Sequence, residues 1–511
     1  MSNIDSPNKH KGPRFIKLAG STLAFAVATA LLPLSPLGTL LPTMGQAIAA
    51  GCTPSGPPPI DLKFVGTDGW ISLPRTPSIG FFHPDSNAPT LNDGSTNTFT
   101  TYIFGFRDVT GLSDSQISQQ KMKAQHNAPL FWVDEFDAND IDPITCKPKV
   151  FRVHLTNLGM QQRPDLFDSH TLHWHGFRNV IPYYDGEPTG SIAVPPGSTQ
   201  KAFDYIYSSH EPGTYMYHCH VEDVEHVHMG MTGLVFVRPL QNKTGVGSGA
   251  ATAPVARVKG GTATNAPMGY AYNDGVALAD PKSTAYDREY AMFLSEVWAE
   301  AHWDDAHIQL PDWTDYHADF GLLNGRTYPD TLQPNSPWTL PADISTLHSL
   351  PVQRDATTGE LAVPTDARLQ YQPLSARVEA KEGERVLLRF ANLGFREASM
   401  NLDGAKLRVI GKDATPMKGR DGTDTSYETN TLEFGAGESF DAIFTAPAFK
   451  TTRPAPDPGY DTYVLYNRNF EHASNLATGG FGGQRTEIRV YPSTDAILLP
   501  QQVPNQLFHA L

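Results

Sequence analysis

The chain has 511 residues, which is long enough for two domains of about 200 residues, each with a sizeable core. Its 43 glycines and 42 prolines, together with only 18% charged residues, are typical of a turn-rich protein built from many short strands. The net charge of −15 argues against nucleic acid and against an anionic membrane surface as partners.

Residues 1–50 have the pattern of a secretory signal peptide. A basic segment over residues 9–17 precedes an apolar run to about residue 41, and small residues close the stretch at Ala50. The alternative, a membrane anchor, is disfavoured because prolines interrupt the apolar run. We therefore expect a mature protein that is exported, to a bacterial periplasm or to the cell exterior.

The first domain is expected over residues 57–240, as a Greek-key β-sandwich. Residues 61–65 and 150–155 alternate between apolar and polar side chains or run apolar, as strands do. Turn residues separate such segments. The composition and these patterns together predict an all-β protein.

Metal-binding side chains concentrate in one stretch of this domain, residues 170–231. The stretch contains eight of the 18 histidines and one of the three cysteines. It opens with the sequence HTLHWHG and closes with YHCH, a further histidine and GM. Scattered core residues explain such a concentration poorly, so the stretch predicts a metal site.

Strand geometry divides these side chains between two sites, because residues two apart share a face and odd offsets face opposite ways. Cys219 therefore points away from His218 and His220, and the same alternation separates His170 from the histidine pair that follows it. One site is expected to combine His170, Cys219, His226 and Met231, and the other His173, His175, His218 and His220.

The first set of side chains offers two imidazoles, a thiolate and a thioether, which is the ligand set of a blue-copper centre. A thioether is a poor ligand for zinc, and structural zinc prefers four strong nitrogen or sulfur donors. The second set also suits copper, because imidazole sites with open positions bind copper and present it to oxygen or another small oxidant. The sequence therefore predicts copper at both sites.

These motifs resemble those of the copper-binding cupredoxin domain of multicopper oxidases. In that family the cysteine and its partners hold a type 1 copper that accepts electrons from the substrate. The flanking histidines belong to a three-copper cluster that reduces dioxygen, and the resemblance implies the same roles here. Cys219 and His226 are two residues further apart than in the family, so His228 is an alternative ligand. Met231 follows His226 by five residues, as in the family, which favours His226.

The other two cysteines, Cys52 and Cys146, are expected to form a disulfide, as cysteines of exported proteins do. The alternative is a lipid attached to Cys52, which follows the sequence Ala-Ala-Gly. The leucine expected three residues before a lipidated cysteine is absent.

The remainder of the chain divides into three parts. Residues 241–285 are rich in glycine, alanine and threonine without periodic apolar residues, which is typical of a linker. A second cupredoxin-like domain is expected over residues 286–495, because residues 323–326 and 385–392 also resemble that family. Residues 496–511 form a C-terminal tail.

The second domain has none of the histidine pairs that the resemblance leads us to expect. The three-copper cluster of a multicopper oxidase takes eight histidines, four from each of two domains. Residues 392–404 and 466–472 stand where the second set would fall, and neither contains an H-x-H pair. Among the isolated histidines of this half, His472 is the best candidate for a further ligand.

The resemblance implies a secreted copper-dependent oxidoreductase. Its type 1 copper would take electrons from a metal ion or a phenol, and its histidine-bound copper would reduce dioxygen or another small oxidant. Two alternatives stay open: a homotrimer similar to copper nitrite reductases, and a blue-copper electron carrier or copper-binding protein without enzymatic activity. Four imidazoles on one face favour an enzyme, because burying unmetallated histidines costs desolvation.

Three acidic residues, Glu222, Asp223 and Glu225, lie in the loop between Cys219 and His226. We expect one of them to orient a ligand imidazole through its free N–H. The three carboxylates also predict affinity for oxidisable cations such as Cu(I), Fe(II) or Mn(II). The simpler alternative is a solvated acidic loop.

Overall fold

The structure is a computed structural model. It describes residues 59–74, 88–142, 144–178, 180–197, 202–244, 268–302, 312–342, 344, 347–450 and 457–511. The expected signal peptide and Cys52 therefore lie outside the described residues, whereas Cys146 takes part in a disulfide. No helix within the described ranges is long and apolar enough to cross a bilayer.

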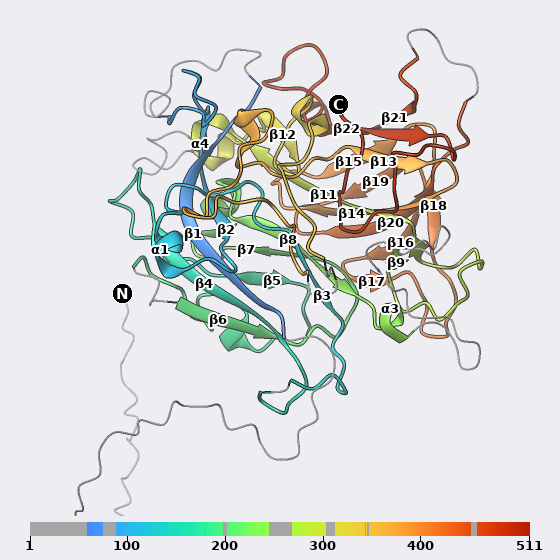
Figure 1. Ribbon diagram of the computed structural model, residues 1–511, viewed down its shortest axis with the longest axis horizontal. Helices are drawn as coiled ribbons and strands as arrows, with labels where there is room; N and C mark the ends of the chain where they lie inside the picture. Colours follow the sequence, from blue (N-terminus) through green and yellow to red (C-terminus); the bar gives the residue numbers. More distant parts are fainter. Residues whose placement is uncertain are drawn as a thin grey trace, which may run out of the picture. The chain divides into compact units, whose positions relative to one another are not determined.

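Two four-stranded sheets face each other in the first half of the chain and form the first sandwich (Figure 1). One sheet has the order β2-β1-β4-β6, from β1 (Asp61–Ile71), β2 (Thr101–Asp108), β4 (Phe151–Gly159) and β6 (Ala202–Tyr207). The other has the order β3-β8-β7-β5, from β3 (Phe131–Asp134), β5 (His173–His175), β7 (Gly213–His218) and β8 (Thr232–Arg238). Alternation places Phe151, Val153 and Leu155 of β4 in the core between the sheets.

The second sandwich is built from two larger sheets. The first follows the order β12-β11-β14-β20-β16-β17, with β18 on β16: β11 (Arg288–Val297), β12 (Phe320–Leu323), β14 (Arg385–Asn392), β16 (Leu407–Lys412), β17 (Thr415–Pro416), β18 (Tyr427–Thr429) and β20 (Ser439–Thr445). The second follows the order β13-β22-β21-β15-β19: β13 (Val378–Lys381), β15 (Ala398–Leu402), β19 (Thr431–Phe434), β21 (Asp461–Asn467) and β22 (Arg485–Tyr491). Their inner faces enclose a second apolar core that includes Leu388, Met400 and Ile488. The predicted all-β class with two sandwiches is confirmed.

Among the described residues, helices are few and short. They are α1 (Asp114–Ser118), α2 (Asp223–His228), α3 (Gln241–Thr244), α4 (Ala299–His302) and the 3-10 helices η2 (Pro182–Tyr184), η4 (Trp313–Asp315), η5 (Asp330–Leu332), η6 (Ala367–Leu369) and η7 (Phe470–His472). Of these, α2 lies within the second half of the metal-binding motif, between Cys219 and Met231.

The strands of the two sandwiches are connected in the same order, although the two halves of the sequence show no obvious repeat. In the first, β1 runs parallel to β4 and β3 runs parallel to β8. In the second, β11 runs parallel to β14 and β13 runs parallel to β22. Residues that occupy matching places in the two sandwiches can therefore be compared directly.

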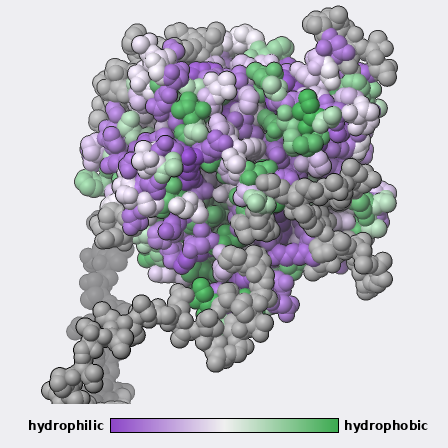
Figure 2. Space-filling model, viewed as in Figure 1, coloured by the Kyte–Doolittle hydropathy of each residue, from purple (hydrophilic) through white to green (hydrophobic). Residues whose placement is uncertain are grey.

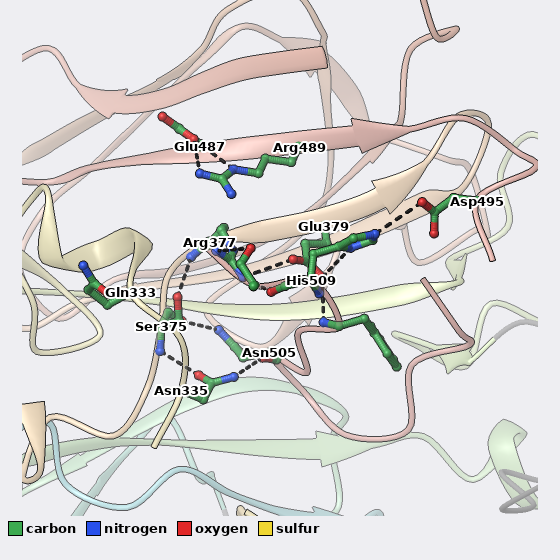
Figure 3. A network of polar contacts seen from close by, with 12 residues as sticks. Gln333, Asn335, Ser375, Arg377, Glu379, Glu487, Arg489, Asp495, Asn505 and His509 are labelled. Carbon is green, nitrogen blue, oxygen red and sulfur yellow. Dashed lines mark hydrogen bonds and ion pairs between the residues drawn. The ribbon is translucent and has the colours of Figure 1, made fainter. Parts of the chain in front are cut away.

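The described residues at the end of the predicted linker and those of the predicted tail contact the second sandwich. Within the predicted linker, β9 (Gly269–Tyr270) and β10 (Ala285–Tyr286) form an antiparallel pair that packs against Leu387 of β14. Arg377 donates to the carbonyl of His509 in the C-terminal tail (Figure 3). The Phe508 N–H of the tail donates to the Glu379 carboxylate. Polar contacts therefore hold the end of the chain against the second sandwich.

Buried charges connect the two sandwiches. Glu289 of β11 accepts from Arg389 Nε of β14 at 2.7 Å and from Arg238 of β8 at 2.9 Å. Arg389 also donates to Thr214 of β7 and to Asp441 of β20. Because the Arg389 and Glu289 side chains are fully buried, each charge depends on its partners for solvation.

Replacing Glu289 by Gln is expected to lower the free energy of unfolding by about 3 kcal/mol, because it removes the counter-charge of the Arg238 guanidinium and leaves the buried Arg389 guanidinium with Asp441 alone. Urea unfolding would measure the change. The matched control is Glu433→Gln on the exposed face of β19, which is expected to change stability by less than about 0.5 kcal/mol. Equal effects of the two substitutions would contradict the assignment.

Candidate metal centre

The Cys219 thiol lies at the end of β7 beside two imidazoles. Its Sγ is 3.2 Å from His226 Nδ1 and 3.9 Å from His170 Nδ1, and all three side chains are buried. The ligand atoms of these residues lie within 4.8 Å of one another. Met231 joins them through the backbone, because the Cys219 N–H donates to its carbonyl at 3.1 Å.

Gly66 of β1 forms the wall behind these side chains. A Cβ atom at this position would lie 2.6 Å from His170 Cδ2 and 3.4 Å from Met231 Cε. Both side chains therefore face the same glycine, and the first set of predicted ligands gathers in one place. No larger residue fits at position 66 unless His170 moves.

The electrostatics of this group favour a thiolate. Burial opposes ionisation of Cys219, but His226 and His170 lower the pKa of its thiol well below the ordinary value. Burial likewise opposes protonation of His226, but the Cys219 thiolate and Asp168 raise the pKa of His226 to about 10. The Thr171 N–H, 3.5 Å from the sulfur, adds a further donor. The group is therefore prepared to present an anionic sulfur to a cation.

A second group of imidazoles lies on the opposite face of the same strands. In the antiparallel pair of β5 and β7, His173 stands opposite His218. The Nε2 atoms of His218 and His175 are 3.0 Å apart, and ligand atoms of these three histidines lie within 4.8 Å of one another. His220 stands at the rim, with its ring centroid 4.7 Å from that of His173.

Backbone carbonyls orient two of these rings. His218 Nδ1 lies 2.7 Å from the carbonyl oxygen of Cys219, and His173 Nδ1 lies 2.8 Å from that of Asp185. An N–H at Nδ1 in each ring leaves the Nε2 lone pair for a metal. Burial, followed by its histidine neighbours, lowers the pKa of His218 to about 3, so the ring is neutral and able to ligate near pH 7.

The structure thus separates the eight predicted ligands as strand alternation predicts, into a thiolate group and a histidine group. It places His226 beside Cys219, whereas His228 accepts a hydrogen bond from the Trp298 N–H at 3.0 Å and lies away from the sulfur. His220 contacts the ring of His173, but it is not one of the three histidines whose ligand atoms lie within 4.8 Å of one another. Among the described residues, no histidine of the second sandwich joins either group.

Sequence reasoning missed Asp168. Its Oδ2 lies 3.6 Å from His226 Nε2, and Asp168, Glu222 and His226 have ligand atoms within 4.8 Å of one another. Of the three loop carboxylates considered from sequence, only Glu222 takes part, while Asp223 and Glu225 lie on α2. The missed signal was proximity in the chain, because Asp168 precedes the ligand His170 by two residues.

The second sandwich contains the same backbone framework around different side chains. Asn467 N donates to the Gln484 carbonyl and Gln484 N to the His472 carbonyl, just as Cys219 N donates to Met231 and Met231 N to His226. Asn467, His472 and Gln484 therefore occupy the places of Cys219, His226 and Met231. His472, the isolated histidine singled out from sequence, instead bonds to the Glu296 carboxylate at 2.7 Å.

The donor atoms decide which metal fits. Thiolate, thioether and two imidazoles in one buried group match the preferences of copper, whereas structural zinc prefers four strong nitrogen or sulfur donors. The histidine group offers three converging imidazoles, of which His173 and His175 are partly exposed, and this suits a copper ion with an open position. Both groups fit copper.

Residues 153–242, which include all eight candidate ligands, match the family model for multicopper oxidases. No curated protein matches the chain. Among solved structures the chain is similar to a blue copper oxidase from Nitrosomonas europaea, with 19% identity over 84% of this chain and 85% of that chain and a TM-score of 0.46. It is also similar to the multicopper oxidase mgLAC, with 19% identity, coverage of 86% and 89%, and a TM-score of 0.47. A copper nitrite reductase from Nitrosomonas europaea shows 14% identity, coverage of 88% and 97%, and a TM-score of 0.45.

Replacing Gly66 by Ala is expected to disturb the thiolate group, because the added methyl displaces His170. We expect a change in the thiolate-to-copper absorption band and at least a tenfold loss of copper affinity, which is about 1.4 kcal/mol. Gly69→Ala in the same strand is the matched control, since the atoms nearest its Cβ would belong to Ala124 and not to a candidate ligand. Both variants should lose roughly 1–3 kcal/mol of stability through overpacking. An unchanged absorption band in Gly66→Ala would rule out this role.

Proposed function

We propose that this protein is a copper-dependent oxidoreductase that takes electrons from a reductant at the thiolate group and delivers them to a small oxidant at the histidine group. The observation that carries the proposal is the sequence His218-Cys219-His220. Cys219 belongs to one group and His218 to the other, so covalent bonds and one hydrogen bond connect the two. Dioxygen is the first candidate for the oxidant.

Copper bound at these groups would supply one-electron transfer at the first and reduction of the oxidant at the second. The protein contributes the rest. Burial of Cys219, His170 and His226 excludes water from the thiolate group. Partial exposure of His173 and His175 leaves the histidine group accessible to a small molecule.

Two further functions remain alternatives. Since the described part of the second sandwich adds no histidine, a neighbouring subunit of a homotrimer, as in a nitrite-reductase-like enzyme, is one source of further ligands. A blue-copper carrier without enzymatic activity would use the thiolate group alone. The rings of His218 and His175 are neutral and face each other, as in a site prepared for a metal. This arrangement favours an enzyme, because a carrier would bind metal at the thiolate group alone.

Export through the N-terminal segment is part of the proposal. The disulfide at Cys146 supports it, because disulfides persist in oxidising compartments such as the periplasm or the cell exterior.

Copper stoichiometry tests the proposal, measured with a visible spectrum on the wild-type protein and on Cys219→Ser. We expect at least two coppers per chain and an intense thiolate-to-copper band in the wild type. The substitution should remove the band and one copper and leave the remaining copper bound. One copper per chain, lost entirely with Cys219, would identify a carrier instead.

The reductant that the geometry favours is a divalent or monovalent metal cation. Asp168 and Glu222 place two carboxylates at the outer edge of His226, whose other ring nitrogen faces Cys219. A cation held by these oxygens would be one imidazole away from the thiolate group. Phenols are the alternative reductant.

Glu222→Gln is expected to slow oxidation of Fe(II) or Mn(II) at least tenfold and to leave oxidation of a phenol within about twofold, because the substitution removes one carboxylate from the cation's position and none from the copper ligands. Asp223→Asn, an exposed residue of the same loop, serves as control. Equal loss with both reductants would show that Glu222 acts on the copper site itself.

A further inference from the structure

The segment between Cys219 and Met231 folds into a helix that points two histidines in different directions. This helix, α2 (Asp223–His228), is only six residues long, and both His226 and His228 are buried in it. Residues two apart on a helix face different ways. His226 turns to the Cys219 sulfur, and His228 turns to the second sandwich.

The second sandwich encloses the His228 ring. The Trp298 N–H, at the end of β11, donates to His228 Nε2 at 3.0 Å. Four aromatic rings of the same sandwich surround it, with centroid distances of 4.9 Å to His302, 5.6 Å to Trp313, 5.6 Å to Tyr316 and 5.4 Å to Phe395. One imidazole thus inserts into an aromatic pocket of the other half of the structure.

The pocket itself is anchored to a buried charge. The Tyr316 hydroxyl donates to Glu296 of β11, and the Phe395 N–H donates to the same carboxylate at 3.0 Å. His472 bonds to Glu296 at 2.7 Å. Glu296 and His472 form a hydrogen-bonded network at the place in the second sandwich that corresponds to the candidate copper ligands of the first. This network holds Tyr316 and Phe395.

The backbone that connects His228 to the candidate ligands His226 and Met231 has little conformational freedom. The Met231 N–H donates to the His226 carbonyl, and the Met229 carbonyl accepts from Phe104 of β2. Gly230 has a φ of +117°, and a Cβ there would lie 2.6 Å from His126 Nδ1. Because these contacts restrict the intervening backbone, a shift of His228 would be transmitted to His226 and Met231.

We propose that His228 is a positioning residue, through which the second sandwich holds the segment 221–231 and sets the placement of His226 and Met231 around the thiolate group. The proposal rests on the proposed function in so far as copper occupies that group. It assigns the second sandwich, which has no copper motif of its own, a part in tuning the copper site of the first.

The test compares His228→Leu with His228→Gln in the full-length protein. Leu fills much of the pocket but cannot accept the Trp298 N–H, whereas the Gln side-chain carbonyl can. We expect His228→Leu to shift the thiolate-to-copper band and the reduction potential, and to raise the hydrogen-exchange rates of residues 221–231 at least tenfold in the metal-free protein. His228→Gln should restore most of each property.

Tyr290→Phe is the matched control, because it removes buried hydrogen bonds elsewhere in the second sandwich, where the Tyr290 hydroxyl donates to the Glu379 carbonyl and accepts from the Glu379 N–H. If His228→Leu does not fold, Trp313→Ala removes one half-exposed wall of the pocket and should produce the same changes in smaller measure. An unchanged band, potential and exchange rate in a folded His228→Leu or Trp313→Ala variant would overturn the proposal. Because the exchange measurement uses metal-free protein, it separates failure of this proposal from failure of copper to bind.

Discussion

The alternation of side chains along one short strand is the constraint on which the candidate centre depends. At the end of β7, the Cys219 sulfur faces a closed, apolar interior, while the His218 ring faces the histidine group on the other side. The two environments differ in water access and in the softness of their donors, although their residues are neighbours in the chain. Two chemically different candidate metal groups thus share one segment of backbone, and a one-residue shift in strand register would exchange their faces.

The second sandwich carries a different set of side chains on the same backbone framework. Where the first has Cys219, His226 and Met231, the second has Asn467, His472 and Gln484, with the backbone hydrogen bonds retained. Amide and carboxylate groups satisfy one another there, as Asn467 donates to Gln484 at 2.8 Å and His472 bonds to Glu296. Buried polar groups that pair in this way need no cation. The absence of a copper motif from this half therefore reflects a substitution of side chains within a retained backbone framework.

Two kinds of contact join the two sandwiches: buried ion pairs of Glu289 and the inserted ring of His228. Glu289 joins Arg238 of the first sandwich to Arg389 of the second, and these groups are too deeply buried to separate without cost. Near the thiolate group, the His228 ring sits among aromatic side chains of the other half. The geometry of the first sandwich's ligands is consequently not independent of the second, even though the second supplies none of them among the described residues.

The sequence by itself determined the all-β class and the division of the ligands into two groups, because strand alternation is a local rule that acts over a few residues. It also indicated copper, since the types of donor atom are written in the residue names. The tertiary structure decided what depends on contacts between distant segments. It placed His226 rather than His228 beside Cys219, and it brought Asp168 to the far edge of that ring. It also placed Gly66 behind the thiolate group and set Asn467, His472 and Gln484 at the positions that correspond to the candidate ligands Cys219, His226 and Met231. No local pattern encodes these relations, because they arise when strands far apart in the chain pack together and one loop folds into a helix.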